Sequence, residues 1–420
     1  MIGFLISALK IIFLLGFLIF IHEGGHFLVA KLCKVRVNEF AIGFGPTIWR
    51  KKGKETTYAV RLIPLGGFVS MEGEEERSSN EGSFSQASIP KRMAIVVAGA
   101  AVNIVFALVV YFILMASTGN YVTTRIEQVL EGNAAQTAGI MVGDKIVAIN
   151  DKTIHLKEDI DSAVANSNGQ EMKVTVEREG EKKEIYVTPS TKTRKVTGIY
   201  LQATGNKLTQ IAQIDQNSAA QKAGLAIGDE ILAINGQQIN GDQTILLQLM
   251  QEQGNTTMEM TVQRGNETLN FQLTPSDEFY YELGIIVKQA GDNFSERIYY
   301  GYWETISFMG SILDNLKELF TGNIGLDQMM GPVGISSVVS STQGIQDFVY
   351  ILALISLSLG VTNLLPIPAL DGGKLLILLI EAIRRKPLQE KTEISIQMLG
   401  FAFLIVLSIV VAYQDIVRIF

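Results

Sequence analysis

Residues 11–32 read IIFLLGFLIFIHEGGHFLVAKL, an apolar segment that carries two histidines and a glutamate in its second half. The whole segment runs from about Phe4 to Leu32, which exceeds the roughly 20 residues that a helix needs to cross a bilayer. An ionisable side chain at the centre of such a helix costs about 2.5–3.5 kcal/mol on insertion scales. A chain that keeps several of them there indicates a functional site inside the membrane.

His22, Glu23 and His26 form the pattern H-E-x-x-H. Because residues four apart lie on one face of a helix, both imidazoles can bind one zinc ion, and Glu23 can accept the proton of an attacking water. A pair of structural, hydrogen-bonded histidines is the alternative. That alternative does not explain Gly24 and Gly25, which weaken the same helix but leave room for another backbone to approach. We therefore expect a bound cation.

Three further apolar segments are long enough to span a membrane. They run from Met93 to Ser117, from Phe348 to Ile383 with a break at Pro366 and Pro368, and from Ile394 to Val417. A cleaved signal peptide is the alternative for the first segment, but that segment lacks a basic n-region and a small-residue cleavage site. We expect a polytopic α-helical membrane protein with about four transmembrane helices.

Composition narrows the class of protein further. Hydrophobic residues make up 47% of the 420 residues, and the net charge of −7 argues against a nucleic-acid partner, which would require a basic surface. Cys33 is the single cysteine, so an internal disulfide is excluded. Basic residues gather in the loop between the first two spans, as in Arg50, Lys51 and Lys52, and between the last two, at 384–386. Both loops are predicted to be cytoplasmic, which places both termini and residues 119–330 outside the cytoplasm and the active site near the cytoplasmic side of the cell membrane.

The middle of the chain contains an internal repeat. AAQTAGIMVGDKIVAIN at residues 134–150 recurs as AAQKAGLAIGDEILAIN at 219–235, which predicts two copies of one small domain. The pattern resembles the PDZ domain, and we expect two tandem extracytoplasmic PDZ domains at residues 119–203 and 204–290. Each copy ends in a glycine and an apolar run, at Gly198, Ile199 and at Gly284, Ile285.

In bacterial PDZ domains such a segment resembles the loop and strand that receive a peptide end, which would bind by strand addition. Spacer domains that bind nothing are the alternative, since a fold does not imply a function. In the following region, residues 291–346, apolar residues recur at helical spacing from Arg297 to Phe320. This stretch is predicted either to lie on the membrane surface or to form a packed helix.

A catalytic zinc usually has three protein ligands and one open position. Asp371, in the stretch NLLPIPALDGG at residues 363–373, is the best candidate for the third. Pro366 and Pro368 break the helix beside it, and such backbone is tolerated in a membrane only where it lines a cavity or is buried in protein. Glu381 lies nearer the basic loop, where we expect it to be solvated. The first and third spans both run inward, so Asp371 can meet the histidines.

H-E-x-x-H on the first span with N-x-x-P-x-P-x-L-D-G on a late span resembles the paired signature of the site-2 protease family. The similarity covers essentially the whole chain and is greatest to bacterial, PDZ-containing members that cleave anti-sigma factors. It implies that His22, His26 and Asp371 bind zinc and that Glu23 is the catalytic base. It also implies that Asn363 positions the substrate or stabilises the oxyanion.

Family members carry a membrane-associated β-structure after the first span, which residues 58–69 and 43–46 resemble. A hairpin at residues 40–70 would offer an edge strand to a substrate helix that has to unwind. Residues 99–103, GAAVN, resemble the G-x-x-x-N element of the second span, with Ala100 where many members have proline. The side chain of Asn103 is predicted either to join helices or to contact substrate. The other expected substrate contacts are Gly66, Gly67, Pro366 and Pro368.

The sequence thus predicts an intramembrane zinc metalloprotease that cleaves transmembrane segments of single-span proteins. Expected substrates are truncated anti-sigma factors and remnant signal peptides, with the PDZ domains as a filter and the lipid bilayer as the surroundings. Residues 1–118 and 347–420 form the two halves of the predicted membrane domain. A non-catalytic PDZ adaptor and a zinc transporter are the alternatives, and the transporter would need several intramembrane acids or histidines along a path.

Overall fold

A computed structural model describes residues 2–74, 76–119, 121–204, 207–253, 256–265, 267–289, 293–322, 329–342 and 344–419. The described chain forms two compact units. Residues 1–114 and 305–412 make up a helical unit, called here the membrane unit, and residues 115–304 with 413–420 make up a β-rich unit.

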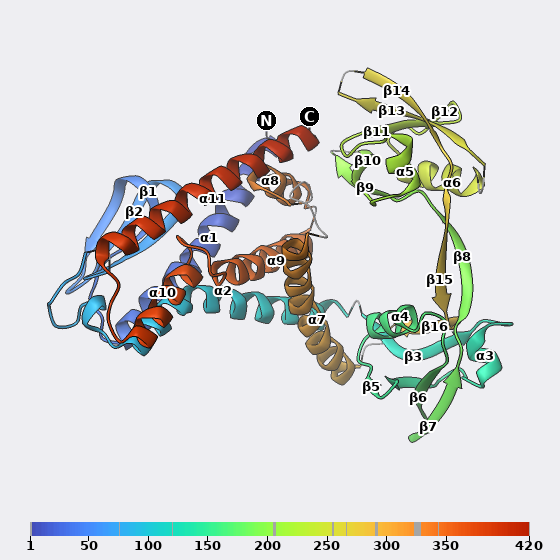
Figure 1. Cartoon of the computed structure of the whole chain (residues 1–420), viewed down its shortest axis with the longest axis horizontal. Coiled ribbons are helices and arrows are strands. Elements are labelled where there is room, and N and C mark those ends of the chain that lie inside the picture. The colour runs from blue at the N-terminus through green and yellow to red at the C-terminus, as the bar shows by residue number, and fades with distance from the viewer. Residues whose placement is uncertain are drawn as a thin grey trace. The chain divides into compact units, whose positions relative to one another are not determined.

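Five long helices build most of the membrane unit (Figure 1). They are α1 (Ile2–Leu32), α2 (Ile89–Thr118), α9 (Ile345–Asn363), α10 (Asp371–Arg384) and α11 (Glu390–Ile419). Four stretches are long and apolar enough to cross a membrane, namely Leu5–Leu32, Ile89–Thr118, Ile345–Asn363 and Glu390–Ile416. These four helices match the four predicted spans, except that the third, predicted to continue to Ile383, ends at Asn363, before Pro366.

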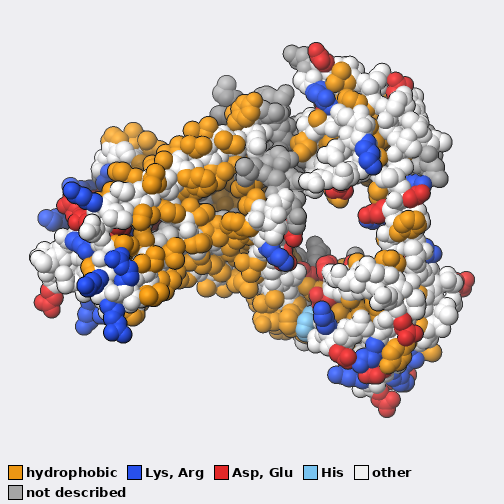
Figure 2. All heavy atoms as spheres, in the orientation of Figure 1, with side chains coloured by type: hydrophobic (Ala, Val, Ile, Leu, Met, Phe, Trp, Pro, Cys, Tyr) orange, Lys and Arg blue, Asp and Glu red, His pale blue; other side chains and the backbone are white. Residues whose placement is uncertain are grey.

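Apolar side chains cover most of the face of these helices that Figure 2 shows. Leu399 is 73% exposed and Val406 is 60% exposed, which is favourable only where lipid replaces water. Inside the unit, glycines allow backbones to approach closely, the usual basis of helix association in membranes. A Cβ on Gly360 would lie 2.9 Å from the carbonyl oxygen of Ala100, and a Cβ on Gly25 only 2.5 Å from that of Ala98.

The predicted hairpin is present as two long antiparallel strands, β1 (Val37–Lys52) and β2 (Thr57–Met71). Residues 37–42 pair on one side with 67–71 and on the other with 57–60. Segment 67–71 is therefore an edge of this small sheet. A backbone edge next to membrane helices is a ready place for another strand to pair.

The β-rich unit contains two sheets of similar order. The first follows β16 (Ile285–Gln289), β3 (Val122–Val129), β4 (Lys145–Ile149), β6 (Met172–Arg178) and β7 (Glu181–Val187), and the second follows β9 (Ile199–Thr204), β10 (Lys207–Ile214), β11 (Glu230–Ile234), β13 (Met258–Arg264) and β14 (Glu267–Leu273). The two-residue strands β5 (Lys152–Thr153) and β12 (Gln237–Gln238) pair antiparallel with β4 and β11, respectively. Helices α3 (Ala134–Ala138) and α4 (Lys157–Asn166) belong to the first repeat, and α5 (Ala219–Ala223) and α6 (Gln243–Gln253) to the second.

The C-terminal end predicted for each of the two repeat domains is wrong, because its last strand belongs to the sheet of the other repeat. Strand β9 was expected to close the first repeat but pairs with β10 of the second, and β16 was expected to close the second but pairs with β3 of the first. The chain leaves the first sheet along β8 (Ser190–Val196) and returns along β15 (Ser276–Glu282), and these two strands pair with each other. The second repeat is thus inserted into the first. A sequence period fixes the copies but not the sheet that each strand joins.

Each repeat has its own core and the same buried ion pair. Asp144 and Asp229, equivalent residues of the two copies, are almost fully buried, and each is bound by two nitrogens of one arginine. The Nε of Arg178 lies 2.7 Å from Asp144, and the Nε of Arg264 lies 2.7 Å from Asp229. The backbone N–H three residues before each aspartate donates to it as well. This bidentate arrangement fixes the start of β4 and β11.

The predicted amphipathic stretch is one helix, α7 (Phe294–Thr321), followed by α8 (Pro332–Ser341). Its beginning packs on the first repeat, where the ring of Trp303 stacks on His155 with 3.3 Å between ring centroids. Further along, Phe308 stacks on Tyr111 of α2 at 4.1 Å. These contacts favour the packed helix over a helix lying free on the membrane surface. Residues 291–292, 323–328 and 343 of the predicted linker lie outside the described residues.

Candidate metal centre and its cavity

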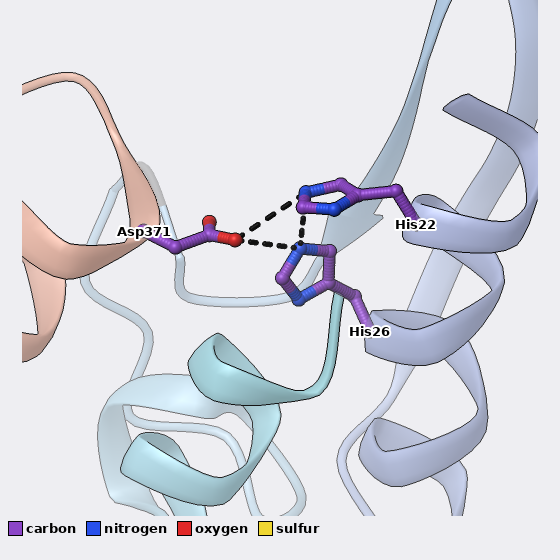
Figure 3. Close-up of side chains that lie close together, drawn as sticks. All are labelled: His22, His26 and Asp371. Atoms are coloured by element: carbon purple, nitrogen blue, oxygen red, sulfur yellow. Dashed lines mark hydrogen bonds and ion pairs between the residues drawn. The ribbon is translucent and has the colours of Figure 1, made fainter. Parts of the chain in front are cut away.

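Three predicted ligands meet at one point, as Figure 3 shows. The Oδ2 of Asp371 lies 3.3 Å from the Nε2 of His22 and 3.5 Å from the Nε2 of His26. The two Nε2 atoms are 3.2 Å apart. Both histidines project from α1, and Asp371 from the first turn of α10. Residues almost 350 positions apart in sequence thus form one cluster of ligand atoms, the one such group among the described residues.

The spacing of these atoms suits zinc. With bonds of about 2.0–2.2 Å, two ligands of a tetrahedral zinc lie about 3.3–3.5 Å apart, and the three observed separations are 3.2, 3.3 and 3.5 Å. Two imidazoles and one carboxylate also match the donor set of catalytic zinc, which leaves a fourth position open. The Oδ2 of Asp371 is buried and has no hydrogen-bond partner among the described residues. The residues present therefore fit a zinc ion.

Helix α2 orients both imidazoles through their Nδ1 atoms. His26 Nδ1 lies 2.8 Å from the carbonyl oxygen of Ile95. A carbonyl can only accept, so this Nδ1 carries the proton and the lone pair of Nε2 faces Asp371. The amide of Asn103 lies 3.4 Å from His22 Nδ1 and is fully buried. Such second contacts fix the orientation of metal-binding histidines.

Asn103 therefore makes a contact between helices, the first of the two roles predicted for it. Its partner is a candidate ligand, and its backbone oxygen accepts a hydrogen bond of 2.9 Å from Ser356 on α9. Space for the imidazoles comes from Gly99, because a Cβ there would lie 2.3 Å from the Nε2 of His26. The two predicted glycines of α1 differ: Gly25 allows α2 to approach, whereas a Cβ on Gly24 would meet nothing within 4 Å.

The loop before α10 holds Asp371 in place. Pro366 and Pro368, predicted as substrate contacts, shape this loop, and Pro368 packs against Gly400 of α11. The backbone N–H of Ala369 donates to the Oε1 of Gln397, also on α11, at 2.5 Å. Gly372 is required here, since a Cβ on it would lie 2.2 Å from the carbonyl oxygen of Leu365.

A cavity of about 1030 Å³ opens beside the ligands. Glu23 and Asn363 line it together with His22, His26 and Asp371. The edge segment of β2 contributes residues 68–71. Two glycines were predicted as substrate contacts. Gly67 lies next to Glu23, since a Cβ on Gly67 would lie 3.5 Å from the Cγ of Glu23. Gly66 lies against the ring of Phe44. The proposed base, the ligands and a free backbone edge therefore face one space.

Several charged residues of this cavity were not predicted, among them Lys374 and Glu74. Lys374 Nζ lies 2.6 Å from Glu74 Oε1, and both line the cavity. Lys374 could have been found, because it follows Asp371 by three residues and shares its helix face. Glu74 lies in a loop and carries no such signal. Glu381 was predicted to be solvated, and this prediction is wrong. Its side chain is only 3% exposed, and its carboxylate lies 3.2 Å from the guanidinium of Arg92, which takes the place of water as its partner.

The predicted peptide-receiving glycines have equivalent surroundings in the two repeats. Gly198 and Gly284 both have a φ of +74°, a conformation that favours glycine. The carbonyl oxygen of each accepts a backbone hydrogen bond of 2.9 Å, from Asp215 and Leu130 respectively. Ile199 begins β9 and Ile285 begins β16, and each of these strands is the last of its sheet. Both sheets thus end in a strand that follows a left-handed glycine.

Comparison with known proteins agrees with the site. The family model of peptidase family M50 matches residues 10–407. The regulator of sigma-W protease RasP of Bacillus subtilis is 32% identical over 99% of this chain and 100% of its own length. The regulator of sigma-E protease RseP of Escherichia coli is 28% identical over the full length of both, and the zinc metalloprotease RasP of Bacillus licheniformis is 30% identical over 99% of each.

Among solved structures, the PDZ domain of HtrA3 bound to a phage-derived ligand is 19% identical. The match covers 22% of this chain and 93% of that chain, with a TM-score of 0.19. The full-length relatives and the four apolar helices identify a multi-pass membrane protein. The chain belongs to peptidase family M50, the site-2 protease family, and is a zinc metalloprotease.

Proposed function

We propose that this protease hydrolyses peptide bonds within the transmembrane segments of single-span proteins. His22, His26 and Asp371 would hold the zinc ion, and Glu23 would act as the base. The observation that carries this proposal is the convergence of three ligand atoms, 3.2–3.5 Å apart, in a cavity walled by helices whose outer surfaces are apolar.

When bound, zinc would supply a Lewis acid. It would polarise the scissile carbonyl and lower the pKa of water, so that the water can lose a proton and attack the carbonyl carbon. Glu23 accepts the proton of that water and then donates it to the leaving nitrogen, as a general base and acid. The amide of Asn363 donates a hydrogen bond to the oxygen on which negative charge develops. The carbonyl of Ile95 keeps His26 in the tautomer that presents the lone pair of Nε2, and the contact of Asn103 with Nδ1 helps to hold the ring of His22 in place.

A substrate helix has to unwind before its peptide bonds become accessible, because each is hidden in a helical hydrogen bond. Residues 68–71 of the edge segment of β2 line the cavity, and this segment has a free side. It would pair with the unwound segment and so replace the hydrogen bonds that the helix loses. This pairing also places the scissile carbonyl beside Glu23.

The expected substrates are single-span proteins already shortened outside the membrane, such as anti-sigma factors, and remnant signal peptides. Two relatives are named regulator of sigma-W protease and regulator of sigma-E protease, and these names support this class of substrate. The two repeat domains would act as PDZ-type filters outside the cytoplasm, with a peptide end added to the free edge of β9 or β16. Both termini would lie on the same side.

Cleavage of a purified single-span fragment by the purified chain tests the proposal. E23Q is expected to retain about one zinc per chain but to leave the fragment uncut, whereas E131Q, a surface change on the first repeat, should cut normally. A chelator should stop the wild-type reaction and added zinc should restore it. Full cleavage by E23Q would exclude Glu23 as the base, and a metal-free chain that binds but never cuts the fragment would favour a membrane adaptor.

A further inference from the structure

A second cavity in the membrane unit, of about 730 Å³, contains none of the zinc-site residues. It lies between the start of α2, the end of α10 and the loop that leads into α2. Four basic residues line it, namely Arg77, Arg92, Arg385 and Lys386, together with the hydroxyl-bearing residues Ser78, Ser79 and Ser85. We call it the basic cavity. Its lining offers hydrogen-bond donors and positive charge.

One acid, Glu381, stands against these four cations in the lining. Its Oε2 lies 3.2 Å from Arg92 Nη1 and its Oε1 lies 3.7 Å from Arg77 Nη2. The backbone N–H of Leu388 also donates to Oε1, at 2.9 Å. The single carboxylate is thus already compensated by two arginines. No carboxylate of the described residues pairs with the other two cations of the wall.

Arg385 and Lys386 are exposed and have no ion-pair partner within the part of the chain that the structure describes. Arg92 Nε is buried and also lacks a hydrogen-bond acceptor among the described residues. A buried donor without an acceptor is unfavourable. An anion that brings several acceptor oxygens would satisfy this donor and neutralise the two free cations.

The cavity lies where the apolar surface of the membrane unit ends. Ile383 is 83% exposed and is followed directly by three basic residues, 384–386. Figure 2 shows Lys and Arg gathered at this end of the membrane unit, near the elements that Figure 1 labels α10, β1 and β2. A lipid with its acyl chains along α10 would therefore have its headgroup at the level of the cavity. Basic pockets between membrane helices bind anionic headgroups in this way.

We propose that the basic cavity binds the phosphate headgroup of an anionic phospholipid. The phosphate would lie between Arg92, Arg385 and Lys386, with the hydroxyl of Ser79 as a further donor. The bound lipid would link α10 to the start of α2, the helices that carry Asp371 and the Nδ1 partners of the histidines. This binding is independent of the proteolytic step.

Native mass spectrometry of the full-length chain in detergent, titrated with phosphatidylglycerol or phosphatidylcholine, tests this proposal. The wild type should bind one phosphatidylglycerol molecule in preference to phosphatidylcholine. R385Q/K386Q removes two positive charges that hold no carboxylate, so it should fold normally and bind phosphatidylglycerol about 10- to 30-fold more weakly. K51Q/K52Q removes the same charge from the exposed part of β1 and is expected to bind like the wild type.

Equal affinity for the two lipids in the wild type, unchanged binding by R385Q/K386Q, or an equal loss in K51Q/K52Q would each overturn the proposal. A third titration with glycerol 3-phosphate separates the lipid from a soluble source of the same phosphate chemistry. Displacement of the lipid only at far higher concentrations of glycerol 3-phosphate supports a headgroup site. Displacement at equal concentrations would show a site for free phosphate instead.

Discussion

Gly99 of α2 and His26 of α1 are so close that a Cβ on Gly99 would lie 2.3 Å from the Nε2 of His26. The same Cβ would lie 2.9 Å from the Cε1 of His22. Helix α2 is thus the wall behind the candidate metal centre, and its backbone lies in contact with both imidazoles. The absence of one side chain provides the space for the ligand atoms.

G99A should therefore displace the imidazoles and weaken zinc binding by at least about 10-fold, the lower end of what disturbed outer contacts of a metal site cost. Zinc content per chain after dialysis measures the effect. G24A is the matched control, because its Cβ meets nothing within 4 Å and alanine favours the helix. Equal zinc content in the two variants would contradict the role of Gly99.

Loss of the Asn103 amide should reduce zinc affinity or activity by about 10- to 100-fold. N103L keeps the approximate volume but removes the contact to His22 Nδ1, whereas N103D places a carboxylate oxygen there, which can accept the Nδ1 proton of a metal-binding imidazole, and should recover part of the loss. S356A is the control, since Ser356 contacts only the backbone oxygen of Asn103. A loss of substrate affinity with zinc binding intact would instead assign Asn103 to the substrate.

D371N replaces an anionic ligand by a neutral amide and should weaken zinc binding more than about 100-fold, beyond the cost of outer contacts. Zinc bound per chain, measured at increasing chelator concentrations, checks this. K374Q changes the residue one turn further along the same helix and should retain its zinc. Wild-type zinc retention in D371N would place the third ligand elsewhere.

R178Q should destabilise the first repeat by about 3–5 kcal/mol, because it leaves the carboxylate of Asp144 buried without its partner. Burial raises the pKa of Asp144, but the hydrogen bonds from Arg178 and the backbone of Met141, together with the charge of Arg178, outweigh burial, so the pKa lies below its ordinary value. The stabilisation is therefore present at neutral pH and is lost as the pH falls below about 4. Urea unfolding of the full-length chain measures the change. K182Q, at the exposed start of β7, should stay within about 0.5 kcal/mol of the wild type.

The free energy of unfolding of the region around Trp303 should fall as the pH rises from 4.5 to about 6. Burial, with a smaller contribution from the charge of Glu158, raises the pKa of Glu304 from 4.5 to about 6. The folded chain thus holds a proton that the unfolded chain has released, so unfolding becomes easier through this range. E304Q should flatten the dependence and E171Q should not.

Trp303 and Trp49 are the two tryptophans of the chain, so in a W49F background fluorescence reports on Trp303 alone. Unfolding followed at pH 5 and pH 7 gives the difference for each variant. An equally steep pH dependence in E304Q would exclude Glu304 as its source.

Some residues of the candidate site could be predicted from the sequence and others could not. His22 and His26 were predictable because they lie on one helix, where a spacing of four fixes their common face, and Glu23 because it stands between them in the pattern H-E-x-x-H. Asp371 was predictable because few acids lie in apolar surroundings. Ile95, Lys374 and Glu74 were not predicted as parts of the site. A backbone carbonyl leaves no mark in the sequence, and a loop glutamate resembles any solvated acid.

The sequence by itself determined the four spans, the zinc-binding pattern and the repeat, since each depends on composition or on spacing within one element. Only the tertiary structure decided that β9 and β16 exchange sheets, that Glu381 is buried, and that Gly99 makes room for both imidazoles. These features depend on which distant segments pack together. Local periodicity carries no information on such packing, because the same strand or helix satisfies its own hydrogen bonds or apolar face against more than one neighbour.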